Sequence, residues 1–292
     1  MNNSVIQLIK KNKLRIKSYG QFNLLVIGLL IIFNIQVKAQ TNLQISPSRI
    51  VFDGQTKIME LELTNQGQDS AKYSISFIQI RMTDDGKFET ITSPDPDQKF
   101  SDKNIRFFPR SVRLGPNETQ IIKLQLIKGE QLSSGEYRSH LFFKSLIPIK
   151  ALDAGDIKKD TSAVLFAIVP TFGITVPIII RVGENTNTNN ISDLKIENVT
   201  DGTKKLNLTI NRYGNMSVYG DIIVTYISSN GKETKIGLSK GVAVYTPNKI
   251  HRIKVTLDNK PNVDFSKGVL KVLFTTQSEI RPIKLAEAQL TL

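Results

Sequence analysis

Few side chains in this sequence are suited to catalysis. The chain has no Cys and only two His residues, His140 and His251. This composition excludes disulfides, thiolate zinc sites and Cys nucleophiles, and it leaves almost no material for a Ser/His/Asp triad. His140 stands in an alternating apolar run and His251 beside basic residues. We interpret both as ordinary strand residues.

Carboxylates are more abundant, but their settings favour solvent rather than chemistry. Glu60 and Glu62 lie on the polar side of an alternating segment, and Asp84 and Asp85 lie at a loop tip. No pair has an apolar setting that would raise a pKa for acid–base catalysis. The loop 95–97 lacks the run of oxygen ligands and the closing Glu of a calcium site. We therefore predict a protein that is not an enzyme and that needs no cofactor or metal.

The chemistry that the sequence does offer is hydrophobic strand pairing. Residues 162–182 are β-branched and aromatic, and they carry no charge before Arg181. Pro170 and Pro177 cannot donate hydrogen bonds to a ladder, which favours an edge strand over a central one. A long apolar edge is an aggregation hazard unless it is used, and its obvious use is to pair with an extended partner. The alternative is a buried core strand whose prolines lie at bends.

The N-terminus has the pattern of a secretion signal. A basic region spans residues 10–17, and the apolar run that follows, residues 22–33, is short for a membrane span. Val37 and Ala39 provide small residues at the −3 and −1 positions of a cleavage site. We predict a signal peptide over residues 1–39 and a mature start at Gln40. The alternative is an uncleaved anchor; a lipoprotein anchor is excluded because no Cys follows the run.

Removal of residues 1–39 changes the charge of the protein. This segment holds six Lys or Arg residues and no Asp or Glu, so the formal net charge of +13 falls by six, to +7. The remaining charge is spread along the chain and gives mild steering toward acidic partners. No basic stripe with interleaved aromatic residues is present, so we predict no nucleic-acid binding.

The rest of the chain predicts two β-sandwich domains. Short alternating segments separated by turn signals follow residue 40, and no convincing helical period occurs. The polar run 184–190 is the best linker candidate, and about seven further strand segments follow it. We therefore expect an all-β protein with two immunoglobulin-like β-sandwich domains, over residues 40–183 and 191–292.

Four segments, in this order, resemble the periplasmic pilus-assembly chaperone family (PapD-like). They are Ile45–Gly54, Arg106–Leu126, Gly135–Pro148 and the apolar stretch Ser162–Val182. The resemblance covers Leu43–Val182, and the second domain fits the family in size and place.

The resemblance implies a periplasmic chaperone that binds exported subunits lacking their own last strand. In this family the two sandwiches flank a cleft, and the seventh strand of the first one donates alternating apolar side chains to the open core of the subunit. Two basic residues in the cleft hold the C-terminal carboxylate of the subunit. An outer-membrane usher and a homodimer that protects the edge strand are further partners to consider.

Site residues carry over by position. The donor positions match Val164, Phe166, Ile168 and Pro170. Arg49 matches the cleft arginine, whereas the second base, a lysine in the family, falls near Thr175. Arg181 does not replace it by position. Either another base serves, or the chain binds its client differently.

An immunoglobulin-like structural or adhesive protein of the envelope is the competing function. A chaperone would stay soluble in the periplasm and copurify with a client. A structural protein would copurify with the outer membrane or self-associate.

Overall fold

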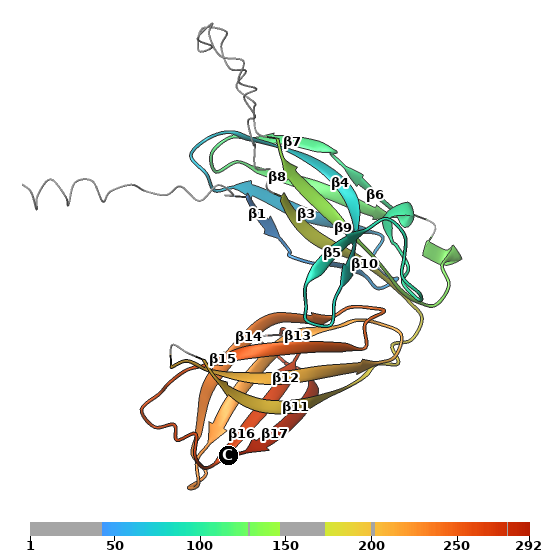
Figure 1. The fold of residues 1–292 in the computed structure, drawn as a ribbon. Helices are drawn as coiled ribbons and strands as arrows, with labels where there is room; N and C mark the ends of the chain where they lie inside the picture. Colours follow the sequence, from blue (N-terminus) through green and yellow to red (C-terminus); the bar gives the residue numbers. More distant parts are fainter. Residues whose placement is uncertain (1–42, 128, 147–172, 200–201, 279) are drawn as a thin grey trace, which may run out of the picture. The chain divides into compact units, whose positions relative to one another are not determined.

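The structure is a computed structural model that describes residues 43–127, 129–146, 173–199, 202–278 and 280–292. Leu43–Leu292 is one compact unit. Its described part is built almost entirely from β-strands, with two short 3₁₀ turns at Asp102–Asn104 and Gly129–Gln131. The prediction of an all-β protein is confirmed (Figure 1). No helix in these ranges is long and apolar enough to cross a membrane.

The first sandwich consists of two sheets. One has the strand order β1 (Leu43–Ser46), β3 (Ile58–Asn65), β8 (Thr119–Leu126), β6 (Ile105–Phe108). The other has the order β2 (Ile50–Phe52), β10 (Gly173–Val182), β9 (Gly135–Ser145), β4 (Ala71–Met82), β5 (Phe88–Ile91), and β7 (Ser111–Leu114) also pairs with β4. Alternating apolar residues from the two sheets, such as Leu61, Leu124 and Leu141, are fully buried in one shared core.

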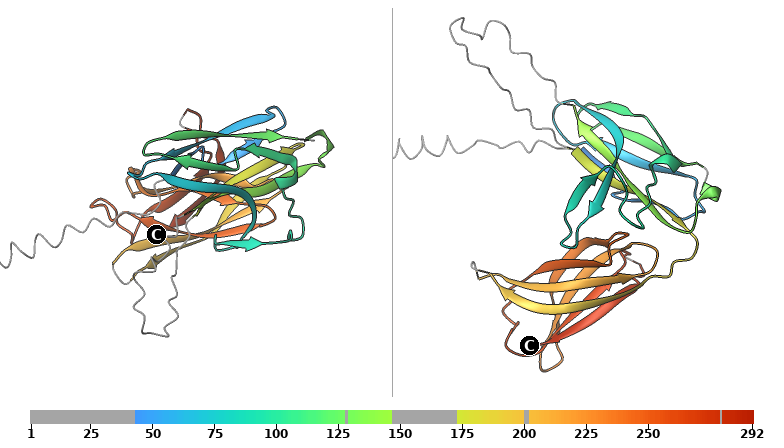
Figure 2. Two further views of the ribbon diagram at one scale, coloured as in Figure 1. Left: turned by 90° about the horizontal axis from the view of Figure 1, so that it is seen from above. Right: turned by 45° about the vertical axis from the view of Figure 1, so that its right-hand side comes forward.

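The second sandwich is also made of two sheets. One has the order β11 (Thr188–Asn198), β12 (Lys204–Tyr213), β15 (Ile250–Leu257), and the other has the order β14 (Glu233–Val244), β13 (Val218–Ile227), β16 (Val269–Thr275), β17 (Lys284–Thr291). Their facing side chains, among them Leu206, Val224 and Phe274, form a separate core. The layered arrangement of strands within each sandwich is visible in Figure 2.

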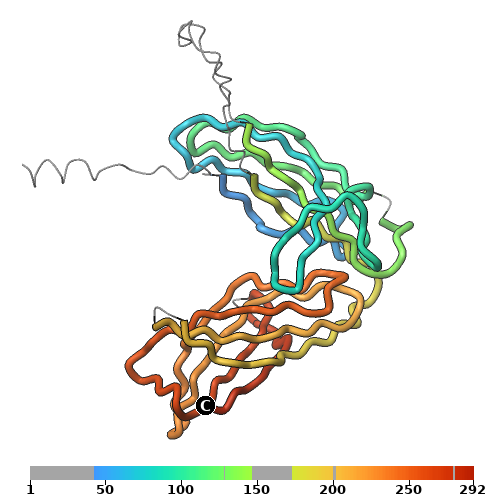
Figure 3. Tube along the Cα trace, viewed as in Figure 1, coloured from blue at the N-terminus to red at the C-terminus, as the bar shows by residue number. Residues whose placement is uncertain are grey.

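Most strands lie where the alternation predicts them. Pro47 lies between β1 and β2, and Pro109 lies between β6 and β7, where a proline cannot donate to a ladder. The short strand β5 was not predicted. At the junction of the two sets of strands, β10 ends at Val182 and β11 begins at Thr188. Figure 3 shows the continuous trace of the chain through this junction. Residues 188–190 of the expected linker are therefore strand, while the domain boundaries themselves stay a prediction.

Strand β10 presents different residues to its two faces. Val176, Ile178 and Ile180 belong to the core of the first sandwich. Ile179 points to the opposite face, where it packs with Met82 and Tyr245 in a small separate cluster. This alternation follows the two-residue period of a strand and fixes which side chains of β10 and β9 face away from the core.

Candidate binding site beside Arg49 and β10

The predicted donor residues Val164, Phe166, Ile168 and Pro170 lie outside the described residues. Their role stays a prediction. The described part of the same stretch begins at Gly173, the first residue of β10.

The edge-strand prediction is wrong for one part of β10 and fits another. Ile178–Ile180 pairs with β9 on one side and, in parallel, with β2 on the other, so these residues are interior. Gly173–Pro177 pairs only with β9 within the described part of the chain. The reason is that the chain passes from one sheet to the other after Pro47. The segment that follows, β2, pairs with three residues of the expected edge.

Arg49 lies directly before β2, where the covered part of this edge begins. Its guanidinium stacks over the ring of Tyr219 at 4.5 Å and lies 5.7 Å from the ring centre of Tyr245. One guanidinium nitrogen, Nη2, donates to Ser217 Oγ at 3.4 Å. The other, Nη1, is buried and has no hydrogen-bond partner among the described residues. Burial lowers the pKa of Arg49 from its usual value, because the charged form loses hydration.

Glu136 is a fully buried acid near this arginine, and its hydrogen-bonding capacity is used. Its Oε2 accepts from Arg181 Nε at 3.1 Å and from Ser217 N and Oγ at 3.0 and 2.7 Å. Its Oε1 accepts from Thr246 Oγ1 at 3.3 Å. Arg181 also donates from Nη2 to the carbonyl of Ser217 at 2.7 Å. Whether another base takes the place of the missing lysine stays open.

A second buried arginine, Arg138, was not singled out from the sequence. It is 3% exposed, and its guanidinium stacks on Tyr245 at 4.4 Å. Nη2 donates to the carbonyl of Thr246 at 3.3 Å, whereas Nε and Nη1 have no partner in the described part of the chain. Burial lowers the pKa of Arg138, and the nearby charge of Arg49 lowers it further. Buried charges without partners are costly, so this pair of arginines favours an added anion.

The local sequence explains how these groups come together. Glu136, Arg138 and His140 alternate along β9 on the face away from the core. Their direct partners on β10 are Arg181, Ile179 and Pro177. The signal available in the sequence was this alternation of polar residues within an otherwise apolar strand.

A cavity of about 400 Å³ lies beside Arg49 and the uncovered part of β10. Thr175 lines it, at the position where the resemblance expects a lysine, together with Pro177 and His140. His140 is 3% exposed, and its Nδ1 has no partner among the described residues. Burial, assisted by the charge of Arg138, lowers the pKa of His140 to about 3. The imidazole is therefore neutral at physiological pH and offers hydrogen bonds without charge.

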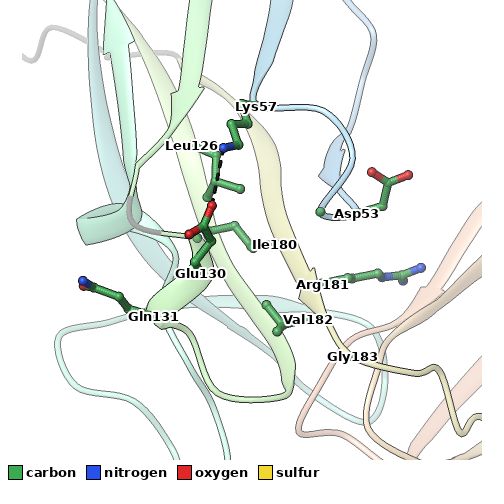
Figure 4. Close-up of a pocket in the computed structure, with 11 residues that line it drawn as sticks. Asp53, Lys57, Leu126, Glu130, Gln131, Ile180, Arg181, Val182 and Gly183 are labelled. Carbon is green, nitrogen blue, oxygen red and sulfur yellow. Dashed lines mark ion pairs between the residues drawn. The ribbon is translucent and has the colours of Figure 1, made fainter.

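Another cavity, of about 500 Å³, lies around the C-terminal end of β10 (Figure 4). Ile180 and Val182 contribute apolar side chains, and Lys57 forms an ion pair with Glu130 at 3.6 Å. Both partners of this pair are largely exposed, so it contributes little. The charges of Lys57 and Glu130 neutralise each other, whereas Arg49 and Arg138 have guanidinium nitrogens without partners among the described residues. We therefore assign this cavity no role.

Comparison with known proteins gives structural likenesses only. No family model matches the chain, and no curated protein matches it. The solved structure of the YadV chaperone is 12% identical and has a TM-score of 0.43, covering 86% of this chain and 100% of that one. The CsuC–CsuE chaperone–tip subunit complex of Csu pili from Acinetobacter baumannii is 12% identical, with a TM-score of 0.42 and coverage of 84% and 99%.

A third likeness is to a chaperone–tip adhesin complex of CFA/I fimbriae. It has 14% identity, a TM-score of 0.42 and coverage of 86% of this chain and 98% of that one. All three of these structures contain chaperones. Because their TM-scores lie below 0.5, the function has to be inferred from the residues of this chain.

Proposed function

We propose that this protein is a periplasmic chaperone that binds exported, fimbrial-type subunits by pairing an apolar strand with them. The observation that carries the proposal is the place of Arg49 at the end of an uncovered strand edge. Gly173–Pro177 has a partner on one side only within the described residues, and β2 takes up the other side from Ile178 onward. An extended chain added to that edge would lie in line with β2 and would stop next to Arg49.

The charge beside the edge selects the direction of the added chain. β2 runs parallel to β10, with Ile50 opposite Ile178. A client strand in the same direction would end beside Arg49 with its C-terminal carboxylate. The opposite direction would place an N-terminal ammonium beside Arg49 and Arg138, where like charges repel. The site therefore favours a parallel client strand with a free C-terminus.

The binding energy would come mainly from apolar side chains. Each one that the predicted donor positions bury in a client contributes roughly 1.5–3 kcal/mol. A charge-assisted hydrogen bond from Arg49 to the carboxylate adds roughly 1.5–3 kcal/mol and fixes the register. This division makes the donor strand the main source of affinity and Arg49 the source of alignment.

A pull-down from periplasm tests the proposal. The tagged wild-type protein, Ile168→Asp and Ile283→Asp are expressed with their leaders, and captured chains are identified by mass spectrometry. Ile168→Asp introduces a charge at a central donor position and is expected to abolish capture. Ile283 is 65% exposed and lies just before β17 in the second sandwich, so Ile283→Asp controls for the added charge.

Equal capture by all three proteins would refute donation by this strand. Recovery of the wild-type protein with the outer membrane, without a client, would support the alternative of a structural or adhesive envelope protein. The usher and the homodimer stay predictions, which the same pull-down addresses through the identity of the captured chains.

A further inference from the structure

The cavity beside Arg49 has a wall of rings. Phe88, His140 and Tyr245 all line it, and their ring centres lie 6.2–6.4 Å apart. Two of the three pairs are edge-to-face, the geometry that aromatic rings prefer. Pro177 and Ile253 add apolar surface to the same cavity. A flat apolar group could extend this ring cluster.

The volume of the cavity is enough for one large side chain. It measures about 400 Å³, near the lower end of the range of roughly 300–1,000 Å³ for ligand pockets. Arg49 also lines this cavity, so a carboxylate on its guanidinium would lie beside the ring-lined space.

The charges around the rings exclude a cationic occupant. Aromatic clusters often bind cations through their faces. Here Arg49 and Arg138 already lie over Tyr245, at 5.7 and 4.4 Å from its centre. Both arginines would repel an additional cation, whereas they would attract an anion. The occupant that fits has a negative end and an apolar, flat end.

We propose that this cavity recognises the last residue of the client, with its carboxylate on Arg49 and its side chain against Phe88, His140 and Tyr245, and that it selects a C-terminal aromatic residue. The inference rests on the proposed function and adds specificity to it. His140 acts here as a neutral wall whose unpaired Nδ1 can meet a polar atom of the ligand. Arg49 is thus the base that lines this cavity together with neutral groups such as His140, and the neutral Thr175 stands where the resemblance expects the second base.

The two histidines make the cavity directly observable. His140 and His251 are the only His residues of the chain, and both line this cavity. NMR spectra of protein labelled with ¹⁵N-histidine therefore report on it alone, and His251→Gln assigns the two imidazoles. The probes are N-acetylphenylalanine, N-acetylalanine and N-acetylphenylalaninamide, which test the side chain and the carboxylate separately.

N-acetylphenylalanine is expected to shift the His140 signals and to bind about tenfold more tightly than either of the other probes. Phe88→Ala should reduce the preference for phenylalanine over alanine to less than about threefold. Phe88 is 56% exposed, so its loss spares the core; Phe108→Ala, at a side chain that is 75% exposed on β6, is the matched control and should keep the preference.

Equal binding of the phenylalanine and alanine probes, or a preference that survives Phe88→Ala, would overturn the proposal. So would the absence of any shift with all three probes. If only this inference is wrong, the wild-type protein will still capture subunits in the pull-down. Undiminished capture of subunits by Ile168→Asp, together with intact probe binding, would instead contradict the donor-strand function.

Discussion

At the scale of single residues, Glu136 is the buried acid beside β10, and it forms its ion pair with Arg181. It accepts hydrogen bonds from Arg181, Ser217 and Thr246, and its side chain has no exposed surface. Arg49 and Arg138 are left without an acid of their own in the described part of the chain. Binding of an anion therefore relieves a cost that folding has already incurred.

Substitution Glu136→Gln should destabilise the protein by about 3 kcal/mol, because it leaves the charge of Arg181 unpaired in a largely buried site. The free energy of unfolding is measured by urea denaturation. Glu130→Gln removes an exposed carboxylate, that of the Lys57 pair, and is expected to change this free energy by less than about 0.5 kcal/mol. Equal effects of the two substitutions would show that the Glu136 network is not stabilising.

The buried imidazole of His140 should make stability depend on pH. Burial lowers its pKa to about 3 in the folded protein, from 6.5. As the pH falls below 6.5, the unfolded chain takes up a proton that the folded protein does not, so stability falls. The slope for this one group is about 1.4 kcal/mol per pH unit. Urea denaturation between about pH 6 and about pH 4 should show a shallower slope for His140→Gln than for the wild type; equal slopes would contradict a neutral, buried His140.

At the scale of elements, the β4–β5 hairpin brings Phe88 to the cavity. Its turn, Thr83–Lys87, closes with hydrogen bonds between Thr83 and Lys87 and from Gly86 N to Thr83 O. Gly86 has φ +80°, and a Cβ there would clash with His251 Nε2. The turn before β14, Ser228–Lys232, has the same hydrogen bonds, and its Gly231 also has φ +80° but has nothing within 4 Å of a Cβ.

This pair of turns separates backbone strain from the close approach to His251. Gly231→Ala should lower the free energy of unfolding by about 1 kcal/mol, through the positive φ alone. Gly86→Ala should lower it by clearly more and should shift the NMR signals of His251. Equal losses, with unchanged His251 signals, would mean that the hairpin does not rely on this contact.

The sequence allows the strands to be predicted more readily than the site. Alternation and proline positions locate most strands, since a strand in a two-sheet core must alternate. β5 escapes this criterion because Phe88–Ile91 is largely exposed and shows no buried face. The alternation does indicate the polar residues of β9, but it does not indicate their partners: Arg138 donates to the carbonyl of Thr246 across 108 positions of sequence, and no local pattern encodes that contact.

At the scale of the whole molecule, the predicted export signal would determine where the mature protein begins. Residues 1–39 are predicted to be removed, which lowers the formal charge to +7. N-terminal sequencing and intact mass of protein from periplasm should give a chain that starts at Gln40. A chain that begins at Met1 and fractionates with the inner membrane would show the uncleaved anchor instead.

The parallel pairing of β2 with β10 has a consequence for timing. β2 already pairs with the edge of β10 beyond Pro177. A client strand that pairs with the uncovered part of this edge would therefore have to end there. An internal segment of a polypeptide would collide with residues 49–52, while a finished end would not. A subunit still being threaded through the inner membrane has no such end to offer. The geometry would thus let this protein seal only subunits whose synthesis and translocation are complete.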